Sequence, residues 1–419
     1  MARDRTTLPM SNEESYENRQ PGLYAVSHCW MTITLSRSTL EDRDAAPRRP
    51  DRLARLPEQY FVTLRRLVEA AAAGPGEPLI DLSRGNPEVG PPPHVVDALC
   101  AAARRRTAHG YASPLGLPQL KEALAERYRS LYGVELDPER EVAVVPGTKT
   151  AVAELALVLA DSGRKVVLPD PGYPDCLSGV ALAGARVERA RLDAADAYAP
   201  DFASLPREAA ALYLNYPSNP CAICAPPGVF DEAVHWAEET GTVVVHDLAY
   251  ADLVFDGREP HSFLAVPGSK EVGVELYSMS KTYGMAGWRL GFVVGNAEVV
   301  ARINLLTTHL RSGVFRPVQE AGIAALSGPQ DSVEARRARY EARRDRVAAA
   351  TGARSEGTFF TWIRLPEGVT AGTLLADSRV AVAPGEGFGA RGTGWARISL
   401  AVPDDALDAA LERIAPALS

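Results

Sequence analysis

The stretch that decides the fold is YSMSKTYGMAGWRLG, residues 277–291. It begins in an apolar run that reads as a β-strand and passes Ser278 before it reaches Lys281 and a glycine-rich turn. Because α/β sheets bind ligands at the carboxyl ends of their strands, we expect Lys281 at a ligand site. A partly desolvated lysine can lose its proton there, attack an aldehyde and form a Schiff base. Arg289 follows the turn, which can bring its guanidinium group back toward an anionic part of the ligand bound at Lys281.

A short match of this kind more often marks a solvated loop lysine, so neighbouring strand ends have to supply the context. Residues 243–245 read as a buried strand, and Asp247 stands where that strand ends. An aspartate in this place can pair with a cationic group of a ligand and keep that group protonated. A structural aspartate buried there would be costly unless it too found a cation.

An aromatic residue follows another strand end. Residues 165–168 read as a strand that leads into PDPGYP, where prolines present the ring of Tyr173. An offset-stacked aromatic can hold the planar ring of a ligand. The alternative is an ordinary turn tyrosine.

A candidate anion site precedes these strands. Residues 142–145 are a β-branched run that ends in Pro146 and in Gly147, Thr148 and Lys149, and an apolar helix follows at once. Free N–H groups and the helix dipole point to one spot at such a junction, so we expect these three residues to cradle a phosphate. The spacing of a Walker loop is absent.

Near the end of the chain, residues 358–363 alternate like a strand, and WARISL follows at 395–400. Arg397 lies in this second segment. An arginine fork binds a carboxylate with two parallel hydrogen bonds and so orients an amino acid. The alternative is a plain strand-edge arginine.

Length and composition indicate an ordinary globular enzyme. The chain has 419 residues, 46% of them apolar, and a net charge of −8. This balance argues against a surface for nucleic acid or anionic membranes. No stretch approaches the roughly twenty apolar residues of a membrane span, and the N-terminus lacks an apolar signal core. We therefore expect a cytoplasmic protein.

The five cysteines are an odd number scattered over a long chain, so a disulfide framework is not expected. Cys221 and Cys224 form a C-x-x-C pair, but no second pair at ligand spacing accompanies them. We predict neither a metal site nor a redox role for them.

Strands that alternate with helices from 142 to 294 predict a three-layer α/β/α domain with a mostly parallel sheet. We assign residues 91–314 to this large domain. The segments 51–90 and 315–419 are expected to form a smaller α+β domain. Residues 1–50 are rich in Arg, Asp, Ser and Pro without sustained periodicity, which predicts a flexible extension.

Together, and in this order, the motifs resemble those of the fold-type-I, class I/II aminotransferases that use pyridoxal phosphate (PLP). The resemblance covers roughly residues 55–419. It implies that Lys281 holds PLP as an aldimine and that Asp247 pairs with the pyridine nitrogen. Arg397 matches the arginine that binds the α-carboxylate of the substrate.

The same resemblance implies further contacts. Within NYPSNP, residues 215–220, Asn219 is expected to donate to the phenolic oxygen of the cofactor, and Tyr250 to make the second contact with that oxygen. Tyr173 is expected on the ring. The implied phosphate site contains Gly147, Thr148, Lys149, Ser278 and Arg289.

Two residues would complete the site. Gly85 lies in a segment similar to the G-x-P entry of the family and is expected to bring its backbone close to the substrate. Tyr111 matches a tyrosine that reaches the cofactor phosphate of the other subunit, which implies a homodimer. Arg84 is open between a substrate-side cation and a loop charge.

The chain departs from the family pattern in two places. Cys221 and Ala222 replace the usual Thr-Gly after the asparagine loop, which leaves the details of that loop open. Leu248 replaces an acid that does not touch the ring in the family.

We conclude from the sequence that this is an enzyme that moves the amino group of an L-amino acid to a 2-oxo acid. A β-lyase, a decarboxylase and an oxidative deaminase remain alternatives because the same residues support them. A catalytically silent PLP-binding protein is a further alternative. The substrate side chain is open, since five residues cannot be placed in or out of the pocket: Tyr24, Arg84, His109, Arg311 and Arg316.

Overall fold

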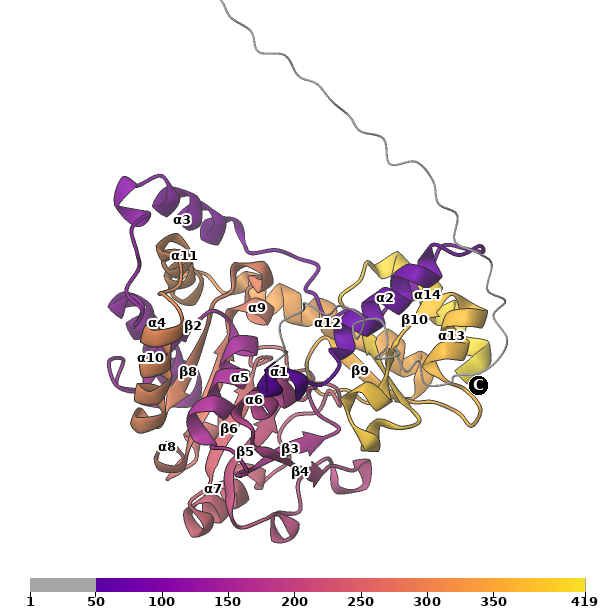
Figure 1. Ribbon diagram of the computed structural model, residues 1–419. Helices are drawn as coiled ribbons and strands as arrows, with labels where there is room; N and C mark the ends of the chain where they lie inside the picture. The colour runs from indigo at the N-terminus through magenta and orange to yellow at the C-terminus, as the bar shows by residue number, and fades with distance from the viewer. Residues whose placement is uncertain (1–49, 419) are drawn as a thin grey trace, which may run out of the picture. The chain divides into compact units, whose positions relative to one another are not determined.

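A seven-stranded sheet forms the centre of the fold in the computed structural model, which describes residues 50–418 (Figure 1). Its strand order is β2-β8-β7-β6-β5-β3-β4. Strands β4, β3, β5, β6 and β7 run parallel, and β8 runs antiparallel to its neighbours β7 and β2. The mostly parallel sheet is therefore confirmed. The bounds are β2 (Val142–Val145), β3 (Lys165–Asp170), β4 (Arg186–Arg191), β5 (Ala209–Asn215), β6 (Val243–Leu248), β7 (Gly273–Ser278) and β8 (Gly291–Gly295).

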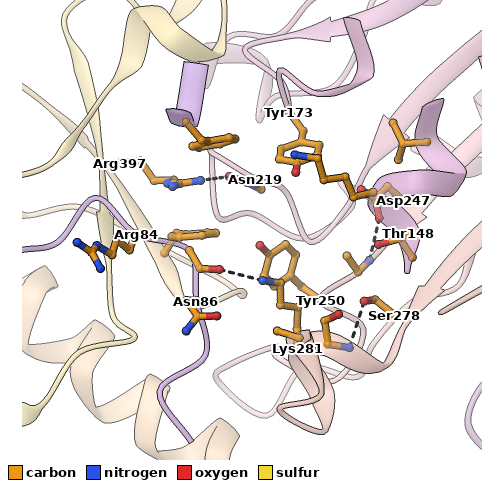
Figure 2. A pocket seen from close by; sticks show the side chains of 18 of the residues that line it. Arg84, Asn86, Thr148, Tyr173, Asn219, Asp247, Tyr250, Ser278, Lys281 and Arg397 are labelled. Carbon is orange, nitrogen blue, oxygen red and sulfur yellow. Dashed lines mark hydrogen bonds between the residues drawn. The ribbon is translucent and has the colours of Figure 1, made fainter. Parts of the chain in front are cut away.

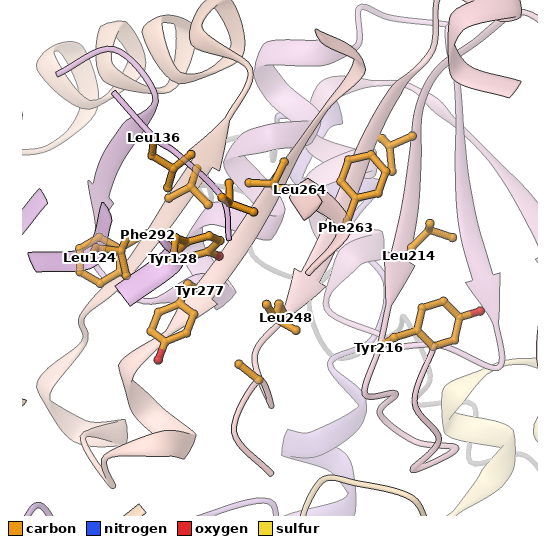
Figure 3. Close-up of a cluster of buried hydrophobic side chains, with 14 of the residues drawn as sticks. Leu124, Tyr128, Leu136, Leu214, Tyr216, Leu248, Phe263, Leu264, Tyr277 and Phe292 are labelled. Carbon is orange, nitrogen blue, oxygen red and sulfur yellow. The ribbon is translucent and has the colours of Figure 1, made fainter. Parts of the chain in front are cut away.

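Alternate side chains of the strands enter two separate cores. In β2, Val142 and Val144 belong to one apolar cluster, shown in Figure 3, whereas Ala143 and Val145 belong to another. The first cluster is completed by helices α4 (Pro118–Tyr132), α7 (Val229–Thr240) and α11 (Arg316–Ser327). The second is completed by α5 (Thr148–Leu159), α6 (Cys176–Ala183) and α10 (Ala297–Leu310). Helices therefore cover both faces, and the predicted three-layer architecture is confirmed.

Segments far apart in the sequence form two smaller sheets. Strand β1 (Ile80–Asp81) pairs in parallel with β10 (Val380–Ala381). The other sheet is antiparallel and has the order β11-β12-β9, with β11 (Ala383–Pro384), β12 (Trp395–Ser399) and β9 (Phe360–Arg364). In Figure 1 the indigo helix α2 (Tyr60–Ala72) lies among these yellow elements, and Arg379 donates to the carbonyl oxygen of Ala71 at 2.8 Å. The boundaries of two domains at 91 and 314 remain a prediction.

The remaining α-helices lie before, between and after these strands in the chain. They are α1 (Asp51–Ala54), α3 (Pro93–Ala103), α8 (Ser269–Val272), α9 (Met279–Thr282), α12 (Asp331–Thr351), α13 (Ala371–Ser378) and α14 (Asp404–Leu418). Helices α11 and α12 are separate because Gly328 and Pro329 lie between them, and a proline lacks the N–H that a continuous helix needs. Between residues 50 and 418, no helix is both long and apolar enough to cross a membrane. The expected extension at residues 1–50 and Tyr24 lie, apart from Pro50, outside the described residues, and the cytoplasmic location stays a prediction.

Truncation of one leucine in the first core tests the role of α4. Leu124 is fully buried (0% exposed), and Leu131 on the same helix is 46% exposed. We expect Leu124→Ala to cost about 2–5 kcal/mol of unfolding free energy, because it leaves a cavity. Leu131→Ala should stay within about 0.5 kcal/mol. Denaturant unfolding of cofactor-free protein measures both, and equal losses would contradict the assigned packing.

Candidate active site

A cavity of about 510 Å³ lies at the carboxyl ends of the central strands (Figure 2). Strand β5 leads to Asn219, β6 carries Asp247, and β7 ends at Ser278, three residues before Lys281. The small sheets supply the opposite wall. Most of the predicted site residues line this cavity: Gly85, Thr148, Lys149, Tyr173, Asn219, Asp247, Tyr250, Ser278, Lys281, Arg289 and Arg397.

Lys281 is presented by the short helix α9, which Ser278 caps by accepting a hydrogen bond from the N–H of Ser280. Its Nζ donates to the carbonyl oxygen of Gly85 at 2.9 Å and lies 5.0 Å from the centre of the Phe359 ring. Burial lowers the pKa of Lys281 to about 8, and the positive charges of Arg397 and Arg289 act in the same direction. The structure thus favours a nucleophilic lysine, since about a tenth of it is uncharged at pH 7, compared with well under a thousandth of an ordinary lysine.

The turn that carries Lys281 is fixed by hydrogen bonds to the carboxylate of Asp252. Thr282 donates its hydroxyl to Asp252 Oδ2 at 2.7 Å, and Arg127 donates to Asp252 Oδ1 at 2.6 Å. Arg127 also donates to the hydroxyl of Tyr277 at 2.8 Å. Helices α4 and α9 and the end of β7 are therefore joined through one ion pair, which holds the lysine in place.

Asp247 supplies a negative charge to the cavity. Burial raises the pKa of its carboxyl to about 6, and this is opposed by the charge of His246 and by a hydrogen bond from the N–H of Ala249 to Oδ1 at 3.1 Å. The carboxylate is thus mostly ionised at neutral pH. A protonated ring nitrogen would pair well with this desolvated carboxylate, and the pairing would offset the free-energy cost of burying the carboxylate.

An anion pocket lies at the start of α5, twelve residues long. Gly147 precedes the helix with φ of +85°, and no side chain caps the first turn. A Cβ on Gly147 would lie 2.3 Å from Nη2 of Arg289, whose own φ is +56°. Free N–H groups and a guanidinium therefore converge on the wall at Thr148. The pocket fits a phosphate group.

Lys149 has a different neighbour from the one expected. Its Nζ pairs with Asp175 at 2.7 Å, and Asp175 also accepts a hydrogen bond from the hydroxyl of Tyr173 at 2.5 Å. Gln59, at the start of α2, donates to the same carboxylate. This ion pair and the hydrogen bond to Tyr173 meet at one carboxylate, and the phosphate contact of Lys149 remains a prediction.

Arg397 faces Lys281 across the cavity from β12 (Figure 2). Its Nη1 donates to Oδ1 of Asn219 at 2.7 Å and its Nη2 to the carbonyl oxygen of Ser83 at 3.0 Å. The guanidinium carbon lies 3.8 Å from the centre of the Phe360 ring. Burial lowers the pKa of Arg397 to about 10, so the group keeps its charge at neutral pH. Among described residues, its buried Nε has no hydrogen-bond partner, which leaves donor capacity for a carboxylate.

In the asparagine loop, Cys221 and Ala222 occupy the positions of the Thr-Gly pair in the family pattern. Ala222 has φ of +59°, in the region where glycine is favoured, and its carbonyl oxygen accepts from the N–H of Glu356 at 2.7 Å. Cys221 is buried, 1% exposed, in an apolar cluster with Trp362. With Cys-Ala at these positions, the side chain of Asn219 lines the cavity.

Two predicted site residues do not line the cavity. They are Gly147, which directly precedes the lining residue Thr148, and Tyr111, whose side chain is 98% exposed. Of the residues left open, Arg84 lines the cavity but pairs with Asp81 and extends away from Lys281 (Figure 2). The others are engaged elsewhere: Arg311 with Glu154, Arg316 with Glu320, and His109 with the carbonyl oxygen of Ala103.

Sequence reasoning missed several wall residues. Phe61 and Leu64 come from α2, and their helical spacing marked a buried face without indicating a ligand. Phe360 was read only as a strand residue, yet it stacks on Arg397. Asn86 and Ser280 are next to predicted site residues, and that proximity was the one available signal.

Comparison with known proteins agrees with this geometry. Residues 77–414 match the family aminotransferase class I and II. The L-glutamine–4-(methylsulfanyl)-2-oxobutanoate aminotransferase of Bacillus subtilis is 42% identical over 86% of this chain and 94% of its own length. An LL-diaminopimelate aminotransferase of Desulforudis audaxviator is 39% identical over 87% and 96%. The glutamate-pyruvate aminotransferase of Escherichia coli is 36% identical over 88% and 93%.

Solved structures agree as well. Substrate-bound BacF from Bacillus subtilis superposes with a TM-score of 0.82 at 34% identity, covering 89% of this chain and 98% of that one. An aminotransferase from Staphylococcus aureus also gives 0.82, at 33% identity over 88% and 100%. The chain therefore belongs to the aminotransferase class I and II family. It is an enzyme that transfers amino groups between amino acids and 2-oxo acids.

The lowered pKa of Lys281 is open to measurement in the cofactor-free protein. We expect pulse labelling with an amine-reactive reagent to give a midpoint for Lys281 near pH 8, because the ammonium is desolvated and faces two guanidinium groups. Asp247→Asn removes a charge that raises this pKa, so the midpoint should fall; Arg397→Met removes a charge that lowers it, so the midpoint should rise. Peptide mass spectrometry reads out the label. A midpoint near the ordinary lysine value of about 10.4 would contradict the assigned environment.

Proposed function

We propose that the cavity binds PLP through Lys281 and uses it to exchange the amino group of an L-amino acid with a 2-oxo acid. The observation that carries the proposal is the facing arrangement of a desolvated lysine and a desolvated aspartate on adjacent strand ends. When bound, PLP supplies an electron sink for negative charge on the substrate α-carbon.

The residues present suit each part of that cofactor. The uncapped start of α5 and Arg289 would hold its phosphate, and Asp247 would hold its ring nitrogen protonated. Tyr173 would lie on the ring, with its hydroxyl fixed by Asp175. Asn219 uses its oxygen for Arg397 and retains its amide N–H groups for the phenolic oxygen, beside Tyr250.

The substrate carboxylate is assigned to Arg397. The guanidinium is buried among aromatic rings, with ring centres of Phe360, Phe388 and Phe61 at 3.8, 4.8 and 5.5 Å. These rings exclude water and strengthen a carboxylate pair in the cavity. Because Arg397 and Lys281 come from different sheets, a bound amino acid would span the cavity with its α-carbon toward Lys281.

Lys281 is assigned the proton transfers. With a pKa lowered to about 8, Nζ of Lys281 can be uncharged once the substrate has displaced it. It can then take the proton from the substrate α-carbon and later deliver a proton to the carbon atom that has received the amino group. The carbonyl oxygen of Gly85, 2.9 Å away, holds Nζ near the centre of the cavity. The amino group left behind is passed to a 2-oxo acid in the return half of the reaction.

Two further points complete the proposal. Tyr111, 98% exposed, is suited to a contact across a homodimer, in which it would reach the phosphate site of the partner. The relatives are named for different amino donors, which supports the reactant classes, amino acid and 2-oxo acid.

The role of Lys281 is tested by Lys281→Ala. We expect turnover to fall more than about 10³-fold, because the variant loses both the cofactor linkage and the proton carrier. Borohydride treatment followed by peptide mass spectrometry should no longer find a reduced cofactor adduct. Lys165→Ala, a surface lysine paired with Glu208, is the matched control and should behave as wild type. Retained turnover together with a reducible linkage would refute the role.

Single-turnover spectroscopy separates transamination from the alternatives. PLP-loaded enzyme mixed with one amino acid and no acceptor should lose its visible band and yield one equivalent of 2-oxo acid with pyridoxamine phosphate. The amino acid that does so identifies the donor. Repeated turnover without acceptor, with release of ammonia, carbon dioxide or a thiol, would instead support a lyase, a decarboxylase or an oxidative deaminase.

A further inference from the structure

A histidine with no exposed surface lies behind the active site, and none of the steps above uses it. His246 stands one residue before Asp247 in β6. Its Nδ1 lies 2.7 Å from Oε2 of Glu275 in β7, and its Nε2 lies 3.0 Å from the carbonyl oxygen of Tyr216, just after β5. Both His246 and Glu275 are 0% exposed.

The hydrogen bonds determine the charge of this pair. A carbonyl oxygen can only accept, so Nε2 of His246 must carry a proton. Glu275 accepts from the hydroxyls of Tyr128 at 2.7 Å and Ser262 at 2.8 Å and from the N–H of Phe263 at 2.8 Å. Three donors besides the imidazole favour the ionised carboxylate, so the proton shared with His246 resides on Nδ1. His246 is thus an imidazolium and Glu275 its counter-ion.

The pair joins the three strands that carry the site. His246 is directly opposite Glu275 in the register of β6 and β7. Tyr216 is three residues before Asn219, and Glu275 is six residues before Lys281. Since successive side chains of a strand point to opposite faces, His246 acts on the face of β6 away from Asp247.

We propose that His246, charged and held by Glu275, is a positioning residue that sets the mutual placement of Asn219, Asp247 and Lys281. A buried ion pair is a weak source of stability, but its hydrogen bonds are directional and short. The imidazolium charge also favours the ionised form of Asp247. The proposal rests on the proposed function, because it concerns the geometry of those three residues.

Two substitutions separate the two bonds of the imidazole. The amide nitrogen of His246→Gln can reach the place of Nε2, so it keeps the bond to Tyr216 and loses the one to Glu275. The amide of His246→Asn replaces Nδ1, so it keeps Glu275 and loses Tyr216. Glu275→Gln keeps the shape of the pair and removes the counter-ion. The exposed His235→Gln on α7 is the matched control.

We expect kcat to fall about 10- to 100-fold in each His246 variant, because sub-ångström to ångström displacements of catalytic groups have effects of this size. The KM for the amino acid should stay within about threefold, since Arg397 is held by Ser83 and the Phe360 ring as well as by Asn219. A rise in KM with unchanged kcat, or wild-type kcat in folded variants, would overturn the proposal.

A cofactor-independent measurement decides the charge and remains decisive if the variants fail to fold. In the ¹⁵N-histidine-labelled, cofactor-free full chain, we expect two protected ring N–H signals for His246 at neutral pH, absent from His246→Gln. In Glu275→Gln the Nδ1 proton should be lost, with one signal remaining. A single ring proton in wild type would refute the imidazolium. Retained turnover in Lys281→Ala would instead refute the proposed function and leave this signal unchanged.

Discussion

The structure around the cavity has to offset the free energy that is lost when two opposite charges are removed from water at one end of the central sheet. Lys281 and Asp247 lie on adjacent strand ends. Burial favours the uncharged form of each, because it lowers the pKa of Lys281 to about 8 and raises the pKa of Asp247 to about 6. Each charge partly offsets the burial of the other. A ligand that brings a carbonyl carbon to one and a protonated ring nitrogen to the other makes use of both effects.

The surrounding fold maintains this arrangement by using strand ends from one parallel sheet. Parallel strands place Asn219, Asp247 and Lys281 side by side, and the helix that starts at Thr148 adds its free N–H groups at the same edge. Two buried pairs support these strand ends: Arg127 with Asp252, and His246 with Glu275. These buried charges are satisfied by several donors or acceptors each, as desolvated charges require.

The residue that we propose for binding the substrate carboxylate belongs to the other sheet. Arg397 reaches across from β12 and bonds to Asn219, so the group assigned to the substrate carboxylate and a group assigned to the cofactor share a hydrogen bond. A carboxylate that binds Arg397 would compete with or reinforce this contact. Under the proposed function, one amide side chain would therefore link the binding of the amino acid to the electronic state of the cofactor.

The sequence by itself determined the strands and the residues at their ends. Lys281, Asp247 and Arg397 each follow or occupy a short apolar run, and this local pattern survives in the folded chain because strand formation and turn chemistry act over a few residues. The break between α11 and α12 is local in the same sense, since Pro329 lacks the N–H that a helix needs.

The tertiary structure alone decided which distant residues meet. Phe61 reaches the cavity because α2 packs with elements more than 300 residues later, and Lys149 pairs with Asp175, which lies on a different element. The imidazole of His246 reads in the sequence as one more residue beside Asp247, yet it bonds Glu275 and Tyr216. Such contacts depend on how strands pair and helices pack, and neither is encoded in the local periodicity of the chain.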